Sequence, residues 1–414
     1  MAALSPEIIL DFNRGREPER LAMKFANMNR DPFVFLRGTC HLFYQRLAEL
    51  KLSTGGPPTW ICGDLHLENF GTYLGENGLT YFDINDFDEV CLAPATWDIL
   101  RLATSVLVAG PSLGLSDADA NHMASDLIER WRQELANGKP RWIERKTATG
   151  LIGDLMDELK RRKPEKFLDK RTDLKKGKRK LVIDGTKTLA ISDEDRDELT
   201  EFTKGLPTTA GEQQFFKFCD AARRIAGTGS LGIARYVLLI EGNGSPDDNI
   251  LLDLKNSSPS AVAPVSPCAQ PAWPDDAHRI AAIIARCQVV PVELLRPVVF
   301  RGDDYLLREL QPTADRINLQ EAAGDLEAFS QAVHSMGILA ASGHLRAAGR
   351  DGSATADALI AFAQDSNITQ TVLDAALRMA DVTLADFADY RAAYDAGKII
   401  AAEKPQPAPG LSEL

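Results

Sequence analysis

The chain has 414 residues, of which 44% are hydrophobic and 26% charged, so it is an ordinary globular protein, long enough for two or three packed units. Its 47 lysines and arginines against 59 aspartates and glutamates give a formal net charge of −12. This acidic balance argues against a protein whose main task is to coat a nucleic acid or an anionic membrane.

Two further features indicate the compartment. No window approaches the roughly 18 consecutive apolar residues that a membrane span needs, and the N-terminus lacks the basic start and long apolar core of a secretory signal. The six cysteines form no C-x-x-C pair, which is typical of a reducing cytosol rather than of a disulfide scaffold or a structural zinc site. We therefore expect a cytoplasmic protein.

The predicted elements of the first 110 residues are two helices, two short strands and a third helix. In chain order they are residues 19–30, 41–52, 60–62, 79–84 and 97–107. Asp31-Pro32 is expected to break the helical pattern after the first helix.

The middle of the chain begins with a basic stretch and continues with strands. Residues 160–180 hold twelve basic and three acidic residues, which predicts a solvated helix and loop, with a contact surface for phosphates or an acidic partner as the alternative. After them the sequence predicts a hairpin, a Pro/Ser/Ala-rich loop, a helix, two short strands and a helical remainder with a disordered tail. The corresponding ranges are 236–240 with 250–255, 257–274, 278–288, 298–300 with 305–307, and 320–348 with the tail at 405–410.

The densest polar cluster is residues 62–69 (CGDLHLEN). Asp64 and Asn69 stand five residues apart on a loop between two apolar strands, which resembles the catalytic loop of kinase-like phosphotransferases. Aminoglycoside phosphotransferases often carry Gly-Asp-x-His-x-x-Asn there. The resemblance implies that Asp64 accepts the proton of an attacking hydroxyl and that Asn69 ligates magnesium. His66 completes the catalytic candidates, and we expect it to order the loop through a hydrogen bond.

A second acidic cluster, residues 83–89 (DINDFDE), follows the strand at 79–84. In the same kinases an aspartate after this strand chelates magnesium, and another aspartate opens the next helix twelve residues later. Asp86 and Asp98 are twelve apart, so we favour Asp86 as the second metal ligand, with Asp83 and Asp88 as open alternatives. If these acids bind no metal, the alternative is that they form turns at the strand ends.

A glycine-rich segment, residues 227–232 (GTGSLG), enters the predicted hairpin. A dinucleotide-binding loop of this pattern should open a helix, whereas strands follow here, so the glycine loop of a kinase small lobe fits better. The resemblance implies that this segment and Lys255 hold the phosphates of ATP. The segment's candidates are Gly227, Gly229, Ser230 and Gly232.

The order of these motifs departs from that of a kinase. Kinases place the glycine loop and lysine before the catalytic loop, whereas here they follow it by more than 150 residues. A circular permutation keeps every contact, because domain termini commonly lie close together at the surface. We then expect the helix that ends at Ser342–Arg346 to pack beside the strand that begins the catalytic loop.

The sequence resembles the bacterial family known as domain of unknown function 2252, which is grouped with protein-kinase-like folds. The matching segments are residues 33–38 (FVFLRG), 63–71 (GDLHLENFG), 83–89 (DINDFDE), 253–255 (DLK) and the helix around His344. The resemblance implies a kinase-like fold without a defined substrate. The predicted helix at 278–288 has no acid to pair with Lys255, as the helix glutamate of kinases does, and Gln288, Asp253 or Glu309 are the possible substitutes.

The predicted architecture is an α+β, circularly permuted two-lobe kinase-like fold. Its parts are an N-terminal helical segment (1–58), a large-lobe part with the two acidic motifs (59–215), a β-rich nucleotide-binding lobe (216–312) and a helical completion of the large lobe (313–414). The predicted function is ATP- and Mg²⁺-dependent phosphoryl transfer to a hydroxyl of a small molecule. A nucleotide-binding pseudokinase and a metal-dependent phosphoesterase are the alternatives. We expect Arg37 to pair with an acid of the 83–89 cluster, with the binding of an anion as the alternative.

Overall fold

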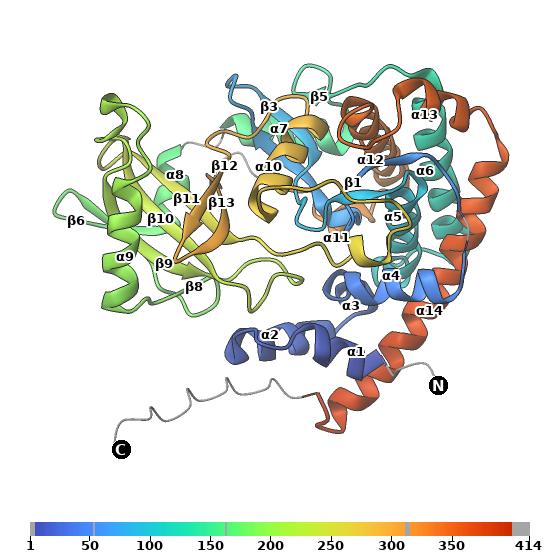
Figure 1. The fold of residues 1–414 in the computed structure, drawn as a ribbon, viewed down its shortest axis with the longest axis horizontal. Coiled ribbons are helices and arrows are strands. Elements are labelled where there is room, and N and C mark those ends of the chain that lie inside the picture. The colour runs from blue at the N-terminus through green and yellow to red at the C-terminus, as the bar shows by residue number, and fades with distance from the viewer. Residues whose placement is uncertain (1–4, 53, 162–163, 311–314, 400–414) are drawn as a thin grey trace.

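The computed structural model describes residues 5–52, 54–161, 164–310 and 315–399. Figure 1 shows a β-rich region on the left and a mostly helical region on the right, with the N-terminal helices below them. The chain builds the β-rich region from the middle of the sequence and then returns to complete the helical region. The expectation of a mixed α+β fold is confirmed.

The β-rich region is built on a six-stranded antiparallel sheet with the strand order β12-β13-β11-β10-β9-β8. The strands are β8 (Thr188–Leu189), β9 (Phe218–Arg224), β10 (Arg235–Gly244), β11 (Asp248–Asn256), β12 (Arg296–Phe300) and β13 (Asp303–Glu309). β10 with β11 and β12 with β13 are the two predicted strand pairs, which confirms both. β8 extends the sheet to residues before the predicted lobe boundary at 216.

Both faces of this sheet are covered, which explains the unbroken apolar run in β10. Alternate residues of a strand point to opposite faces. Leu238 lies in one buried cluster with Leu199 of α9 (Asp193–Lys204), whereas Leu239 lies in another with Phe167 of α8 (Pro164–Asp169). A strand buried on both faces therefore reads as continuously hydrophobic rather than alternating.

The basic stretch 160–180 lies beside this sheet. It comprises the end of α7 (Gly150–Arg161), α8, and a hairpin of β6 (Thr172–Lys175) and β7 (Lys178–Leu181), where a helix and a loop were predicted. Arg162 and Lys163 of the stretch lie outside the described residues. Leu181 anchors the hairpin in the same buried cluster as Phe167. The basic side chains of this hairpin therefore belong to a folded element.

The helical region packs around α5 (Thr96–Ala109), in which every residue but Leu107 is buried. A helix that is buried on almost all sides belongs inside a core, and α5 is in contact with α6 (Asp117–Asn137), α12 (Leu326–Ala347) and α14 (Asn367–Asp395). α6 and α12 approach closely at Gly337, where a Cβ would lie 2.7 Å from the carbonyl oxygen of Leu127.

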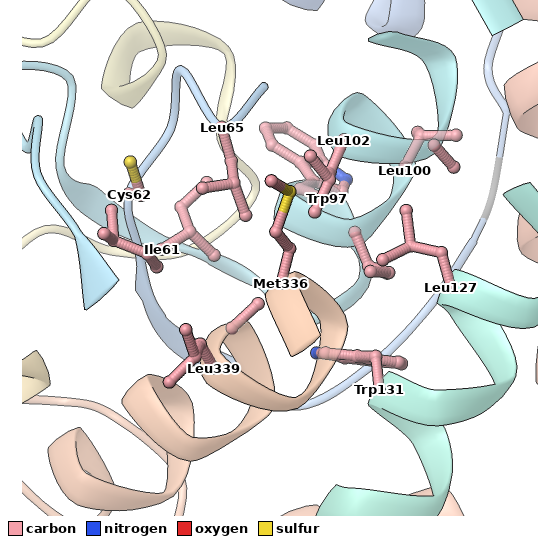
Figure 2. Packing of buried hydrophobic residues seen from close by; sticks show 14 of the residues in the cluster. Ile61, Cys62, Leu65, Trp97, Leu100, Leu102, Leu127, Trp131, Met336 and Leu339 are labelled. Carbon is pink, nitrogen blue, oxygen red and sulfur yellow. The ribbon is translucent and has the colours of Figure 1, made fainter. Parts of the chain in front are cut away.

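The main hydrophobic cluster fills the space between these helices and the strand that precedes residues 62–69. Figure 2 shows Met336 of α12 at its centre, with Ile61 and Leu65 on one side and Leu127 and Trp131 of α6 on the other. Residues from before and after the sheet therefore share one core, and the segment that carries Asp64 is anchored in it.

α1 (Ser5–Phe12) and α2 (Pro18–Met28) form a separate layer against the far end of α14. α3 (Pro32–Gly38) and α4 (Cys40–Glu49) join this layer to the main core, because Phe33 and Phe43 lie in the main hydrophobic cluster whereas Phe35 and Leu42 lie with α1 and α2. α2 and α4 confirm the two predicted helices. Asp31-Pro32 begins α3 where only a break was expected, because the Asp31 carboxylate accepts hydrogen bonds from the Phe33 and Val34 amides at 2.8 and 3.2 Å and proline suits the first helical position.

The remaining elements connect these layers. β1 (Pro58–Ile61) pairs with β4 (Cys91–Pro94), and β2 (Phe70–Leu74) pairs with β3 (Thr80–Ile84), which also pairs with β5 (Ile143–Glu144). The other helices are α10 (Asp276–Cys287), α11 (Leu319–Ala322) and α13 (Ala356–Ala363), with short 3-10 turns at Leu67–Asn69, Pro111–Leu113, Ala210–Glu212 and Ala263–Val265. The predicted tail at 405–410 lies outside the described residues. Within the described ranges, no helix has the length and apolar character required to cross a membrane.

Candidate active site

A cavity of about 600 Å³ brings together motifs that are far apart in the sequence. Its walls come from the N-terminal helices, from both acidic motifs of the helical region and from the glycine-rich segment of the β-rich region. Of the predicted site residues, those that line it are Asp64, His66, Asn69, Asp86, Asp88, Gly227, Gly229 and Ser230. Gly232, Lys255, Asp83 and Glu309 are outside this lining.

The backbone of the loop that carries Asp64 is fixed from beneath by Asp98 of α5. The two oxygens of the buried Asp98 carboxylate accept hydrogen bonds from the amides of Cys62 and Gly63 at 2.8 and 3.0 Å. His344 of α12 lies 3.1 Å from the same carboxylate. Because α12 also contacts β1, the expected packing of this helix beside the strand that begins the loop is confirmed.

Gly63 is required by this arrangement. Its φ is +86°, and a Cβ there would lie 2.4 Å from the carbonyl oxygen of Glu89. A side chain would therefore be strained and would also push the two acidic motifs apart.

The carboxylate of Asp64 is held by Arg101, a fully buried residue of α5. Arg101 Nε donates to Asp64 Oδ1 at 2.9 Å, and Nη2 donates to the same oxygen. Among the described residues no donor contacts Asp64 Oδ2, and the side chain is 22% exposed. Burial raises the pKa of Asp64, while the positive charge of Arg101 opposes that rise. One oxygen is thus fixed and the other faces the cavity.

Asn69 and His66 are oriented by the loop itself. Asn69 Nδ2 donates to the backbone oxygen of Asp64 at 2.5 Å, so its amide oxygen is left as the acceptor. His66 Nδ1 accepts from the Glu68 amide at 3.2 Å, and burial lowers the pKa of the imidazole well below its ordinary value. This hydrogen bond agrees with the expectation that His66 orders the loop.

The three candidate aspartates of the second motif have different environments. Asp86 lies in the cavity wall, and its backbone oxygen is 2.8 Å from the sulfur of Cys62. Burial opposes ionisation of Asp86, but the positive charges of Lys255 and two arginines outweigh it and hold the pKa below its ordinary value. Asp88 forms an ion pair with Lys255. Asp83 is buried in β3 against Arg346 of α12, at 3.0 Å and away from the cavity.

The glycine-rich segment is held by two cations of the N-terminal helical layer. The carbonyl oxygen of Gly229 accepts from Arg16 Nη1 at 2.7 Å and from Lys24 Nζ at 3.1 Å. Lys24 is buried, and burial lowers the pKa of its amine well below the ordinary value. Ser230 Oγ lies 3.4 Å from the Asp88 carboxylate on the opposite wall. The segment therefore bridges the N-terminal layer and the acidic motif.

Positive charge dominates the cavity. Arg235 donates to both carboxylate oxygens of the buried Asp253 at 2.7 and 2.5 Å, Arg224 is 2.8 Å from it, and Arg308 is 3.7 Å from it. Three arginines on one carboxylate leave a positive excess beside the acidic motif. The full set of lining cations is Arg16, Lys24, Arg37, Arg171, Lys187, Arg224, Arg235, Arg308 and Arg316, against the carboxylates of Asp64, Glu68, Asp86, Asp88, Glu89 and Asp315.

The suggested partners of Lys255 make other contacts or lie outside the cavity lining. Asp253 is engaged by arginines, Gln288 donates to the Ile84 carbonyl oxygen at 2.8 Å, and the half-buried Glu309 lies in β13 outside the cavity lining. The partner of Lys255 is Asp88, from the acidic motif itself. The predicted partner of Arg37 is also wrong, because Arg37 pairs with Glu68 of the first motif at 2.7 Å.

Sequence reasoning missed Arg16, Lys24 and Arg101. Arg101 follows apolar residues inside a helix with hardly any polar face, which is a usable signal for a buried, paired charge. Arg16 and Lys24 carry no such signal, because a basic residue in or before an amphipathic helix is usually solvated. Their contacts to the glycine-rich segment depend on its approach from about 200 residues away, which no local pattern predicts.

The fold and the cavity define a mixed α+β protein with an internal polar site in which cations outnumber carboxylates. The chain matches, over residues 16–393, the family described as "Uncharacterized protein conserved in bacteria (DUF2252)", and it belongs to that family. No curated protein and no solved structure matches it.

Proposed function

We propose that this protein is a phosphotransferase with a permuted kinase-like arrangement, which uses ATP and Mg²⁺ to phosphorylate a hydroxyl of a small molecule. The observation that carries the proposal is the single cavity that joins Asp64, Asn69 and Asp86 to the glycine-rich segment 227–230. From their residue types, the sequence predicted that these motifs act at one site, although more than 150 residues separate them.

Asp64 is the base in this proposal. As the acceptor hydroxyl oxygen bonds to the γ-phosphorus and the bond to the departing ADP oxygen breaks, Asp64 Oδ2 takes the hydroxyl proton. The hydrogen bonds from Arg101 to Oδ1 keep the carboxylate in one orientation. Positioning and neutralisation of charge supply most of the acceleration in such a reaction.

Asn69 and Asp86 fit a magnesium site by the chemistry of their donors. Mg²⁺ binds oxygen, usually through one or two protein groups together with substrate phosphates. Asn69 offers an amide oxygen, because its nitrogen is used on Asp64, and Asp86 offers a carboxylate with a lowered pKa. Among the described residues no group of three or more His, Cys, Asp or Glu side chains could hold a metal ion alone. Bound magnesium would neutralise phosphate charge.

The β-rich region supports the nucleotide role through the order of its elements. The glycine-rich segment joins β9 to β10, Lys255 lies at the end of β11, and α10 separates β11 from β12. This is the order of glycine loop, strand lysine and helix that the kinase resemblance implies. The arginines around Asp253 add positive charge suited to the phosphates of ATP.

A nucleotide-binding regulator without transfer is the second candidate. The ion pair between Lys255 and Asp88 favours it, because the lysine is engaged by the acidic motif instead of by a helix glutamate. In an active enzyme the phosphates of ATP must compete with Asp88 for this lysine.

The test measures ATP binding by calorimetry with and without Mg²⁺, then follows ADP formation over a panel of hydroxyl compounds. A transferase binds ATP more tightly with Mg²⁺ and forms ADP only with an acceptor. Asp86→Ala should lose at least tenfold of the Mg²⁺-dependent affinity, whereas Asp374→Ala, on an exposed position of α14, should not. Binding without ADP formation favours the regulator. Hydrolysis of phosphate esters without nucleotide favours the phosphoesterase, and no ATP binding refutes the proposal.

A further inference from the structure

A second group of cations lies on the helical side of the cavity, apart from the arginines around Asp253. Arg37, in the last turn of α3, and Arg316, which follows the β-rich region in the sequence, both line the cavity. Their Nη1 atoms lie 2.7 and 2.8 Å from the same oxygen of Glu68. Two guanidinium groups therefore share one carboxylate oxygen, which leaves a positive excess.

This pair lies beside the base. Glu68 is in the same loop as Asp64, and Arg37 is close enough for its charge to act on both Asp64 and Asp86. Arg37 Nε is buried and has no hydrogen-bond partner among the described residues, so the guanidinium is not saturated by the protein. The Arg316 side chain is 52% exposed, which keeps it accessible.

The β-rich side has its own group of cations for a triphosphate. Arg224, Arg235 and Arg308 surround Asp253 there, and Lys255 lies two residues after Asp253 in β11. Arg37 and Arg316 belong to the other wall, at the first motif. Forked guanidinium donors bind planar carboxylates and phosphates with particular strength.

We infer that the acceptor is an anion, a hydroxyl compound that also carries a phosphate or carboxylate group, and that Arg37 and Arg316 bind this group while the hydroxyl faces Asp64. This inference rests on the proposed function and names its substrate class. A cationic acceptor such as an amino sugar would be repelled by the arginine pair. A neutral acceptor would leave the positive excess unmatched.

The first arm of the test measures binding without transfer. Inorganic phosphate is titrated by calorimetry into the wild type and into Arg37→Gln/Arg316→Gln, each with Mg²⁺ and saturating non-hydrolysable ATP analogue. The double variant should bind phosphate at least tenfold more weakly, with analogue affinity unchanged within twofold. Arg316→Gln alone, at a half-exposed position, should weaken phosphate binding several-fold and guards against misfolding of the double variant. Arg14→Gln/Arg391→Gln removes two exposed charges elsewhere as the matched control.

The second arm measures transfer from labelled ATP to hydroxyl compounds of bacterial extract separated by charge, with glycerol 3-phosphate, glycerol and 3-amino-1,2-propanediol as defined members. Label should enter the anionic fraction alone. Equal phosphate affinity in the wild type and both arginine variants, or transfer to neutral or cationic compounds, would overturn the inference. Failure of the wild type to bind the analogue refutes the proposed function instead, and the phosphate titration, repeated without analogue, still tests the arginine pair.

Discussion

Two walls of the cavity are held in place by opposite charges. We call them the acidic wall, which is residues 62–69 and 83–89, and the glycine wall, which is residues 227–232. At the acidic wall a buried carboxylate, Asp98, accepts hydrogen bonds from the backbone amides of the loop that carries Asp64. At the glycine wall, two buried or half-buried cations, Arg16 and Lys24, donate to a backbone carbonyl oxygen. Negative charge thus holds amides on one side, and positive charge holds a carbonyl on the other.

The difference lies in what surrounds each anchor. Asp98 sits on α5, in the middle of the main hydrophobic core, so the acidic wall shares the stability of the whole helical region. Arg16 follows α1 and Lys24 lies on α2, in the separate N-terminal layer. The acidic wall should therefore be lost only with global unfolding, whereas the glycine wall can be released locally.

The largest expected effect is on the rate of phosphoryl transfer, and it comes from the acidic wall. Asp64→Asn removes the proposed base while keeping a side chain of the same size, so transfer should fall about 1,000-fold. The affinity for the ATP analogue should stay within twofold. Steady-state kinetics and calorimetry measure the two quantities, with Asp374→Asn as the exposed control. A variant as active as the wild type would remove Asp64 from this role.

The next effect concerns stability. Asp98→Ala leaves the Cys62 and Gly63 amides without their acceptor and His344 Nε2 without its partner, so the free energy of unfolding should fall by about 3 kcal/mol. Urea denaturation measures the loss, and Asp374→Ala should lose less than about 0.5 kcal/mol. A loss of that small size in Asp98→Ala would contradict the view that the acidic wall is part of the core.

A smaller effect depends on pH. Burial raises the pKa of Glu89 from 4.5 to about 7, so the folded chain holds a proton there that the unfolded chain has lost between these values. The free energy of unfolding therefore falls as pH rises through this window. Glu89→Gln should match the wild type near pH 5 and exceed it by roughly 2 kcal/mol at pH 8. Parallel stability profiles for the two proteins would show that Glu89 titrates normally.

The smallest effect should come from the glycine wall. Arg16→Gln weakens the contacts to the Gly229 and Leu231 carbonyl oxygens, at 2.7 and 3.2 Å, and should cost about 1 kcal/mol. Hydrogen exchange of residues 227–232 should accelerate several-fold, while exchange in β10 and β11 should not change. Arg14→Gln, two residues earlier and exposed, is the control. If hydrogen exchange in β10 and β11 also accelerated, the glycine wall would not be released locally, which would contradict the difference between the two walls.

The sequence predicted the acidic wall better than the glycine wall for a physical reason. Asp64 and Asn69 lie on one loop, so their relative position follows from local spacing. The spacing to Asp98 favoured Asp86 over Asp83 and Asp88, but the different environments of the three could not be predicted, because they depend on Arg346 and Lys255 from distant parts of the chain.

The same limit applies to the fold. Continuous apolar residues predict strands such as β10, and apolar residues at helical spacing predict helices such as α5. Neither pattern predicts which elements pack against them. Asp31 and Pro32 illustrate a local signal with two meanings, since a helix breaker after one helix is also a capping pair for the next. The pairing of Arg37 with Glu68 depends on how α3 meets the loop, which no local pattern encodes.

The return of the chain to its first region has a consequence during synthesis. Every strand of the six-stranded sheet has left the ribosome once residue 309 has emerged, whereas the segment with Asp64 still lacks Met336 and the whole of α14. Since domains generally fold as units as they emerge, the sheet can form first. The side of α5 that packs against α14 then stays exposed until residues 367–395 have been made, although α6 already covers another side, so the incomplete helical region should be more prone to aggregate than the sheet.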